Sequence, residues 1–298
     1  MTRHLLHVGY PKTGSTFLQR WFEAHPQLAY VEGGIAGFRD VYSIAADNAV
    51  AHDAPLYRVT SAEVLSAPIP DAGKPVIEYQ RVFNLQMATA QLQVCATLAS
   101  LFANATVLIV TRGFRSMILS TLSQYVRTGG DVDLLQMVRT AHEQRDPRWV
   151  ESWDYDTLIA AYRSAFGAEN VFVMPYELLR DDADAFLRTL ASRLGIDAVP
   201  AGRERVNESL SPVELYWYPR LTRFMRRVPT SRLLRKYVDA ALHNRLRRPI
   251  AVLQRLRPGT PFTAEAIPDG LVELFRGRAE SLRGNPLYAP YAADYLHA

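Results

Sequence analysis

Apolar residues occur along the chain in two patterns, short continuous runs and longer segments with helical spacing. The continuous runs predict buried strands at residues 4–10, 74–80, 106–112 and 169–177. Apolar positions three and four residues apart predict helices at residues 15–24, 84–102, 114–130, 153–167 and 182–196. Strands that alternate with helices are typical of an α/β fold with a central parallel sheet flanked by helices.

The other segments have weaker patterns. Residues 26–75 are rich in Gly, Asp, Ala and Pro and keep no sustained period, so we predict loops with short helices there. A length of 298 residues is compatible with one α/β domain. We expect a single domain over residues 1–298, with a core at about 1–200 and a helical, basic C-terminal extension at about 205–298.

The net charge of +4 conceals a strongly basic segment at residues 220–257. This segment holds twelve Lys and Arg residues and one acid, Asp239, so its charge is +11 and the rest of the chain carries −7. Part of it, residues 233–246, has the spacing of an amphipathic helix with arginines on its polar face. Three alternatives remain open: attraction of an anionic acceptor, contact with an acidic membrane surface, or a solvated helical face. No nucleic-acid-binding module accompanies the segment, so we predict no nucleic-acid partner.

Cysteine content and hydropathy indicate a cytoplasmic protein. The one cysteine, Cys95, excludes an internal disulfide and a cysteine-rich zinc site, and it fits a reducing compartment. The N-terminal apolar run is too short for a signal peptide, and no apolar stretch approaches the roughly 18 residues of a membrane span. We expect localisation in the cytoplasm, with peripheral contact at the inner membrane face if the membrane alternative holds.

A glycine loop, GYPKTGST, follows the first predicted strand and opens the first predicted helix. Such a loop presents backbone N–H groups and the positive end of the helix dipole to an anion. Gly9 and Gly14 have the spacing of the loop that binds nucleoside triphosphates, G-x-x-x-x-G-K-[ST], but Ser15 and Thr16 follow the second glycine directly. The lysine, Lys12, comes two residues before that glycine.

The strand at residues 106–112 ends in Thr111 and Arg112, where a triphosphatase needs an acid to hold Mg²⁺. A cation at the carboxyl end of a parallel strand indicates a phosphate group held by protein charge without metal. Ser120 follows eight residues later, on the same helical face as Ser116. We therefore predict no metal site.

The two motifs together resemble those of sulfotransferases that use 3′-phosphoadenosine 5′-phosphosulfate (PAPS). PKTGSTFL is similar to that family's 5′-phosphosulfate loop, and VLIVTRGFRSMILS is similar to its 3′-phosphate motif. VFVMPYELLRDDADAFLRTLASRLGI resembles the later strand, the Tyr-Glu-x-Leu turn and the helix that follows. The resemblance extends over roughly residues 4–196.

The resemblance implies PAPS as the donor, 3′-phosphoadenosine 5′-phosphate (PAP) as a product and a hydroxyl group as the acceptor. It implies that Lys12 neutralises charge on the leaving oxygen and that Thr13, Gly14, Ser15 and Thr16 bind the 5′-phosphate. Arg112 and Ser120 would hold the 3′-phosphate. Phe17 and Tyr176 match aromatic positions near the adenine, although a core role for Phe17 and a turn role for Tyr176 are alternatives.

Many members of the family use a histidine as the base near the end of the second strand, and this chain has none there. Glu78, in the predicted strand at residues 74–80, and Glu32, twenty residues after Lys12, are the candidate bases. We favour Glu78, because a carboxylate in an apolar strand requires an explanation. The alternative is a buried partner for Arg81 or Arg112.

Because glutamate bases resemble those of carbohydrate-sulfating members, a saccharide or glycolipid hydroxyl is the expected acceptor. We expect its pocket to be built from loops at residues 26–75, 127–150 and 205–260. Two alternatives remain open, a P-loop small-molecule kinase and an inactive homologue that binds a nucleotide or a membrane.

Overall fold

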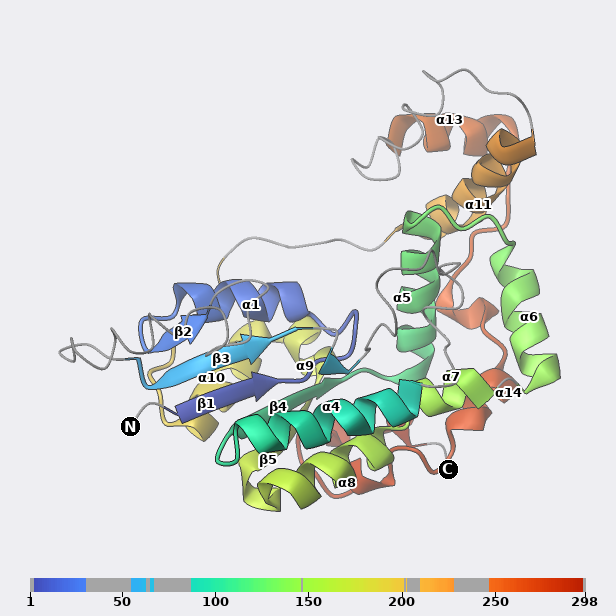
Figure 1. The fold of residues 1–298 in the computed structure, drawn as a ribbon. Coiled ribbons are helices and arrows are strands. Elements are labelled where there is room, and N and C mark those ends of the chain that lie inside the picture. Colours follow the sequence, from blue (N-terminus) through green and yellow to red (C-terminus); the bar gives the residue numbers. More distant parts are fainter. Residues whose placement is uncertain are drawn as a thin grey trace.

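The structure is a computed structural model and describes residues 3–30, 55–62, 65–66, 87–145, 147–200, 202, 210–227 and 247–296. Its centre is a parallel sheet in the order β2-β3-β1-β4-β5 (Figure 1). The strands are β1 (Arg3–His7), β2 (Leu28–Tyr30), β3 (Tyr57–Ser61), β4 (Thr106–Thr111) and β5 (Val171–Pro175). The predicted α/β class with a central parallel sheet is confirmed.

Two strands lie where the sequence pattern predicted loops. β2 and β3 fall within residues 26–75, and β3 pairs with β1 on one side and β2 on the other. The prediction failed because β2 has three residues and β3, YRVTS, mixes polar with apolar side chains. Thr60 and Ser61 are nonetheless buried. The predicted strand at residues 74–80 lies outside the described residues.

Five predicted helices are present. They are α1 (Ser15–Ala24), α4 (Met87–Leu101), α5 (Phe114–Arg127), α8 (Tyr155–Phe166) and α10 (Ala183–Leu194). Four of them, all except α5, cover the two faces of the sheet (Figure 1). Alternate side chains of the central strands belong to opposite cores. Leu5 and Val110 pack in the cluster that contains the apolar faces of α1 and α10, whereas Leu6 and Ile109 pack in the cluster that contains α4 and α8.

Residues 127–150, expected as an acceptor loop, instead hold α6 (Leu134–Gln144) and the start of α7 (Pro147–Ser152). Asp133 caps α6 by accepting from the N–H groups of Leu135 and Gln136. The weak pattern of this region concealed an amphipathic helix whose residues Leu134, Met137, Val138 and Ala141 are buried.

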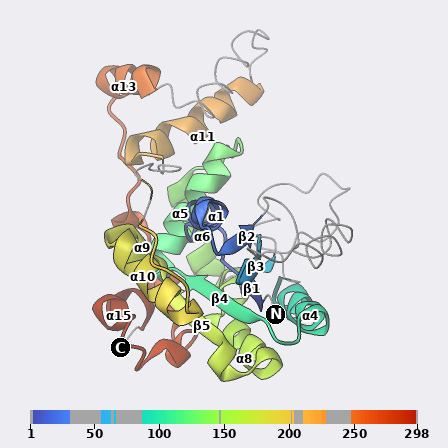
Figure 2. The ribbon, with the colours of Figure 1, turned by 90° about the vertical axis from the view of Figure 1, so that its left-hand side faces the viewer.

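The C-terminal third begins with α11 (Pro212–Arg227) and α13 (Arg247–Leu256), which lie apart from the sheet (Figures 1 and 2). Later residues return to the core, where Phe275 stacks on Phe114 with ring centroids 4.6 Å apart. The short elements of the chain are α9 (Tyr176–Asp181), α14 (Asp269–Val272), α15 (Ala292–Tyr295) and 3-10 turns at Ala168–Asn170, Ala264–Ala266, Glu273–Phe275, Glu280–Leu282 and Ala289–Tyr291.

Three arginines of the basic segment fasten α11 to the connection between α5 and α6. Arg220 pairs with Asp133. Arg223 donates from Nε to the carbonyl of Asp131 at 2.9 Å, and Arg226 pairs with the Asp131 carboxylate at 2.8 Å. These contacts give part of the segment a structural role. Residues 228–246, which include the whole of the amphipathic helix predicted at residues 233–246, lie outside the described residues.

Within the described ranges, no helix is both long enough and apolar enough to cross a membrane.

Candidate active site

The glycine loop connects β1 to α1 at the carboxyl end of the central strand. Thr13 closes the loop, because both its N–H (3.3 Å) and its hydroxyl (2.6 Å) donate to the carbonyl of Tyr10. The Tyr10 ring is buried against Tyr155, with centroids 5.1 Å apart, and anchors the loop in the core. Ser66 donates to the carbonyl of Gly9 at 2.7 Å.

Two residues of the loop adopt left-handed backbone conformations, Lys12 at φ 70° and Gly14 at φ 85°. A left-handed conformation is unfavourable for a lysine, so the surrounding contacts must maintain it. Gly14 also has no room for a side chain, since a Cβ there would lie 2.6 Å from Cδ2 of Leu179. Glycine is therefore required at position 14 for two reasons, the left-handed backbone and the close approach of the Leu179 side chain.

Helix α1 begins directly after Gly14, and no side chain caps it. The N–H groups of its first turn have no intrahelical partner, and the helix dipole makes this end electropositive. The Ser15 hydroxyl is buried and has no hydrogen-bond partner among the described residues. These donors, together with Lys12, form a site suited to an anion.

Arg112, at the end of β4, reaches this loop. Its Nη1 donates to the carbonyl of Lys12 at 2.7 Å, and its Nε donates to the Ser116 hydroxyl at 2.9 Å. Its guanidinium lies over the ring of Tyr176, 4.5 Å from the centroid. Burial lowers the pKa of Arg112, while Tyr176 and Glu177 raise it. The structure thus brings the guanidinium of Arg112 to the main chain of Lys12, so the two motifs that the sequence analysis singled out are in contact.

The remaining predicted donor-site residues lie on neighbouring elements. Ser120 is buried in α5, one turn after Ser116, and its hydroxyl has no partner among the described residues. Thr16 and Phe17 are half-buried in the first turn of α1, and Phe17 packs against the core under that helix. Tyr176, the first residue of α9, offers one face of its ring to Arg112.

A buried carboxylate that sequence reasoning missed lies behind Arg112. Glu177 is fully buried, and its Oε1 accepts from the N–H of Gly113 at 3.0 Å and faces the Ser116 hydroxyl at 3.3 Å. Its Oε2 accepts from the hydroxyl of Tyr295 at 2.6 Å. The Tyr-Glu pair that follows β5 was visible in the sequence, but nothing there linked it to Tyr295.

His7, at the end of β1, is a second residue that the sequence analysis left without a role. Its Nδ1 lies 2.7 Å from the Ser61 hydroxyl, while Nε2 is buried without a partner among the described residues. Burial lowers the pKa of His7 to about 3, so the ring is neutral near pH 7. A Cβ on Gly9 would lie 2.7 Å from this Nε2.

The candidate bases Glu78 and Glu32 both lie outside the described residues, so the choice between them stays a prediction. In the sequence, Glu32 comes two residues after the last residue of β2. In the part of the chain that the structure describes, no group of three or more His, Cys, Asp and Glu side chains could hold a metal ion.

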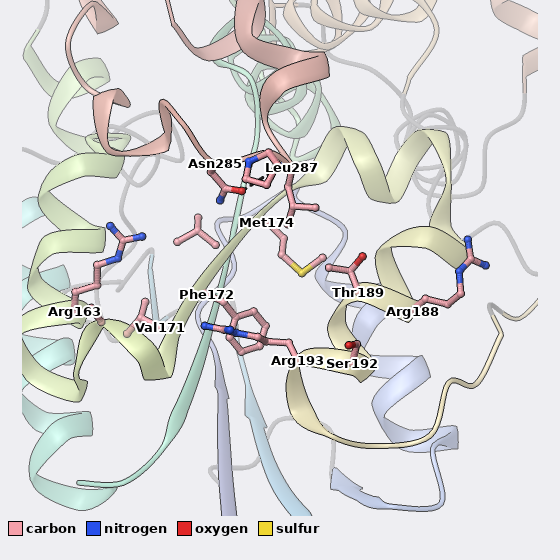
Figure 3. A pocket seen from close by; sticks show the side chains of 13 residues that line it. Arg163, Val171, Phe172, Met174, Arg188, Thr189, Ser192, Arg193, Asn285 and Leu287 are labelled. Atoms are coloured by element: carbon pink, nitrogen blue, oxygen red, sulfur yellow. Dashed lines mark hydrogen bonds between the residues drawn. The ribbon is translucent and has the colours of Figure 1, made fainter.

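A cavity of about 840 Å³ lies elsewhere, at the outer edge of β5 (Figure 3). Three arginines, Arg163, Arg188 and Arg193, surround it, and Val171 and Met174 belong to its apolar lining. None of the glycine-loop residues lines it. This cavity is therefore separate from the candidate active site.

The site combines a glycine loop after the central strand of a parallel sheet with an arginine that follows the neighbouring strand and donates a hydrogen bond to that loop. These features place the chain in the class of α/β proteins with an anion-binding loop. Residues 5–200 match the model described as the sulfotransferase family. The match spans well over half of the chain, so the chain belongs to the sulfotransferase family. The protein is therefore an enzyme that transfers sulfuryl groups.

Solved structures similar to this chain include the following two, each at 16% sequence identity. A sulfotransferase from Alicyclobacillus acidocaldarius has a TM-score of 0.47 and aligns over 78% of this chain and 97% of its own. Mouse sulfotransferase SULT7A1, complexed with PAP, has a TM-score of 0.39 and aligns over 98% of this chain and 88% of its own. No curated protein sequence matches the chain.

Proposed function

We propose that this enzyme transfers a sulfuryl group from PAPS to a hydroxyl acceptor. The single observation that best supports the proposal is the bond from Arg112 to the carbonyl of Lys12. It brings a cation from β4 beside the lysine of a loop whose donors suit an anion, as a donor with phosphate groups at both ends requires. Bound PAPS would supply an activated sulfuryl group and a good leaving phosphate.

The donor set fits such a molecule. Lys12 and the first-turn N–H groups of α1 would bind its 5′ end, with the unpartnered hydroxyl of Ser15 beside them. Arg112 has N–H groups on Nη2 with no partner among the described residues, and the buried hydroxyl of Ser120 likewise has none. These two side chains would bind the 3′-phosphate. In this proposal Thr13 maintains the shape of the loop, because both of its donors bind Tyr10.

The adenine would lie near Phe17 and Tyr176. Since one face of Tyr176 already receives the Arg112 guanidinium, only its other face or its edge is open to a base. Phe17 is half-buried and can contribute an exposed part of its ring.

Lys12 would stabilise the negative charge that develops on the leaving oxygen, and a carboxylate would remove the acceptor proton. We propose Glu78 as that base, with Glu32 as the alternative. No metal ion is required in this mechanism, because Lys12 and Arg112 neutralise the phosphate charge. A saccharide or glycolipid hydroxyl remains our proposed acceptor.

We retain peripheral membrane contact through residues 220–257 as part of the proposal. Phe224 of α11 is 56% exposed, and Val252 and Leu256 of α13 are 52% and 78% exposed. The sequences of both helices also contain arginines. Apolar side chains beside cationic ones suit an acidic lipid surface. Liposome flotation tests this: binding to vesicles with anionic lipid but not to neutral ones supports it, and no binding by the wild type ends it.

Isothermal titration calorimetry with adenosine 3′,5′-bisphosphate and, separately, with ATP plus Mg²⁺ tests the donor. We expect binding of the bisphosphate and a clear preference for it over ATP. A preference for ATP would favour the kinase alternative, whereas binding of both without sulfuryl transfer from PAPS would favour an inactive nucleotide-binding homologue. A parallel titration with EDTA present should leave the bisphosphate affinity unchanged.

A further inference from the structure

We propose that Glu177 and Tyr295 are positioning residues of the donor site. On this proposal, a chain of hydrogen bonds that is buried at Tyr295 and Glu177 and half-buried at Ser116 runs from the C-terminal segment to Arg112, and fixes the arginine against the glycine loop. The inference rests on the proposed function, because it assigns these two residues to the binding of the same donor.

The Glu177 carboxylate is the centre of the chain. A fully buried carboxylate is unfavourable unless donors satisfy its oxygens. Here the donors come from two distant parts of the sequence, the turn after β4 and Tyr295 in α15. Gly113 is also the N-cap of α5, so the carboxylate faces the positive end of that helix. Glu177 thereby fixes the start of α5, which directly follows Arg112 in the chain.

Ser116 joins this carboxylate to the arginine. Its Oγ accepts from Nε of Arg112 at 2.9 Å. The same Oγ lies 3.3 Å from Oε1 of Glu177 and 3.1 Å from the carbonyl oxygen of Gly113, the two acceptors available to its single hydrogen. With Nε held in this way, the other end of the guanidinium points Nη1 at the loop. The orientation of Arg112 thus depends on Glu177 through Ser116.

The C-terminal segment is closely fitted at this place. The Tyr295 ring is 2% exposed and lies 5.0 Å from the ring of Tyr288 and 6.3 Å from that of Phe114, centroid to centroid. A Cβ on Gly113 would lie 2.6 Å from Cβ of Asp294, so only glycine allows α15 to approach the turn. Tyr295 lies beyond residues 5–200, which match the sulfotransferase family. The C-terminal segment therefore adds to the site a contact from outside the family-matched region.

Tyr288 provides a matched control in the same segment. Its ring is as buried as that of Tyr295, and its hydroxyl lies 2.7 Å from the Thr111 hydroxyl on β4. Its connection to Glu177 is indirect, because the Thr111 hydroxyl donates to the Tyr295 hydroxyl at 3.4 Å and Glu177 receives its phenol hydrogen from Tyr295. Tyr288→Phe removes the bond to Thr111 and leaves the bond from Tyr295 to Glu177 in place. Tyr295→Phe removes that bond, together with the longer contact from Thr111, and so breaks the chain that leads to Arg112.

Calorimetry with adenosine 3′,5′-bisphosphate separates the two roles. We expect Tyr295→Phe to weaken bisphosphate binding about tenfold, as the loss of a hydrogen bond to a charged group implies, and to raise the KM for PAPS more than it lowers kcat. Both variants should have a lower Tm than the wild type, because each loses a buried hydrogen bond. Tyr288→Phe should nevertheless leave the bisphosphate Kd within about twofold of the wild type. Equal Kd values for the two variants would overturn the positioning role.

A double-mutant cycle adds a readout that a general loss of stability would not change. If Tyr295 acts through Ser116, the double variant Tyr295→Phe/Ser116→Ala should bind the bisphosphate about as weakly as the weaker single variant. If the increase in the bisphosphate Kd of the double variant equals the product of the increases in the two single variants, the residues act independently and the inference is wrong. Failure of the wild type to bind the bisphosphate would overturn both the proposed function and this inference, whereas wild-type binding that Tyr295→Phe leaves unchanged overturns only the inference.

Discussion

The guanidinium of Arg112 donates a hydrogen bond to the main-chain carbonyl of Lys12, 2.7 Å away, although the two residues are 100 positions apart in the sequence. The contact arises because β4 pairs directly with β1, so the carboxyl ends of the two strands are adjacent. Arg112 thereby binds the carbonyl group of Lys12, the residue whose backbone is left-handed. The arginine of the second motif therefore has a role in the geometry of the first, besides any contact with the donor.

Replacing Lys12 by alanine should remove charge stabilisation at the leaving oxygen. We expect kcat for sulfuryl transfer from PAPS to fall by about 10²–10³, the usual loss when one donor to a developing oxyanion is removed. The bisphosphate Kd should change much less, because the first-turn N–H groups of α1 remain. Arg20→Ala, an exposed cation on the same helix, is the matched control and should retain wild-type kcat. An unchanged kcat in Lys12→Ala would contradict the assignment.

The candidate bases can be separated by isosteric amides. Glu78→Gln should lower kcat by about 10²–10⁴, the typical contribution of a general base, and leave bisphosphate affinity nearly intact. Glu32→Gln should then retain most activity, and Glu23→Gln, an exposed glutamate on α1, controls for the loss of one charge. The reverse result, an active Glu78→Gln and an inactive Glu32→Gln, would transfer the role to Glu32.

The features predictable from the sequence are those encoded in contiguous residues. The glycine loop, β4 ending in Arg112, and the helices on both sides of the sheet each lie within one segment, and all are present. Strands β2 and β3 escaped prediction because they are short, and in β3 the polar Thr60 and Ser61 are buried. The contact of Glu177 with Tyr295 joins residues 118 positions apart, and no local pattern encodes such a pairing.

Gly14 and Gly195 allow the cost of backbone strain to be separated from that of a steric clash. Both have positive φ, but a Cβ on Gly195 would meet nothing within 4 Å, whereas one on Gly14 would meet Leu179. Gly195→Ala should lower the free energy of unfolding by about 1–2 kcal/mol, the cost of left-handed backbone. Gly14→Ala should cost a further 1–3 kcal/mol, roughly the penalty of overpacking. Urea unfolding of the two variants measures the difference, and equal losses would show that Leu179 moves aside freely.

His7 should make stability depend on pH below neutrality. Its folded-state pKa of about 3 lies below the ordinary value of 6.5, because burial disfavours the charged ring. Between these two pH values the unfolded chain holds a proton on His7 that the folded chain lacks. Acid therefore favours the unfolded state: the contribution of His7 to stability is fully present above about pH 6.5 and decreases as the pH falls toward 3.

The size of this effect follows from the linkage relation. Between pH 7 and pH 5, His7 should lower the free energy of unfolding by about 2 kcal/mol. His7→Asn keeps a polar atom near the Ser61 hydroxyl and cannot take up a proton, so its stability should fall by about 2 kcal/mol less than that of the wild type over this range. Urea titrations at pH 7 and pH 8 provide the control, because His7 is mostly neutral in both states there and the two proteins should keep a constant difference. If the wild type and His7→Asn lose equal stability from pH 7 to pH 5, the His7 ring accepts its proton in the folded state and is not held neutral by burial.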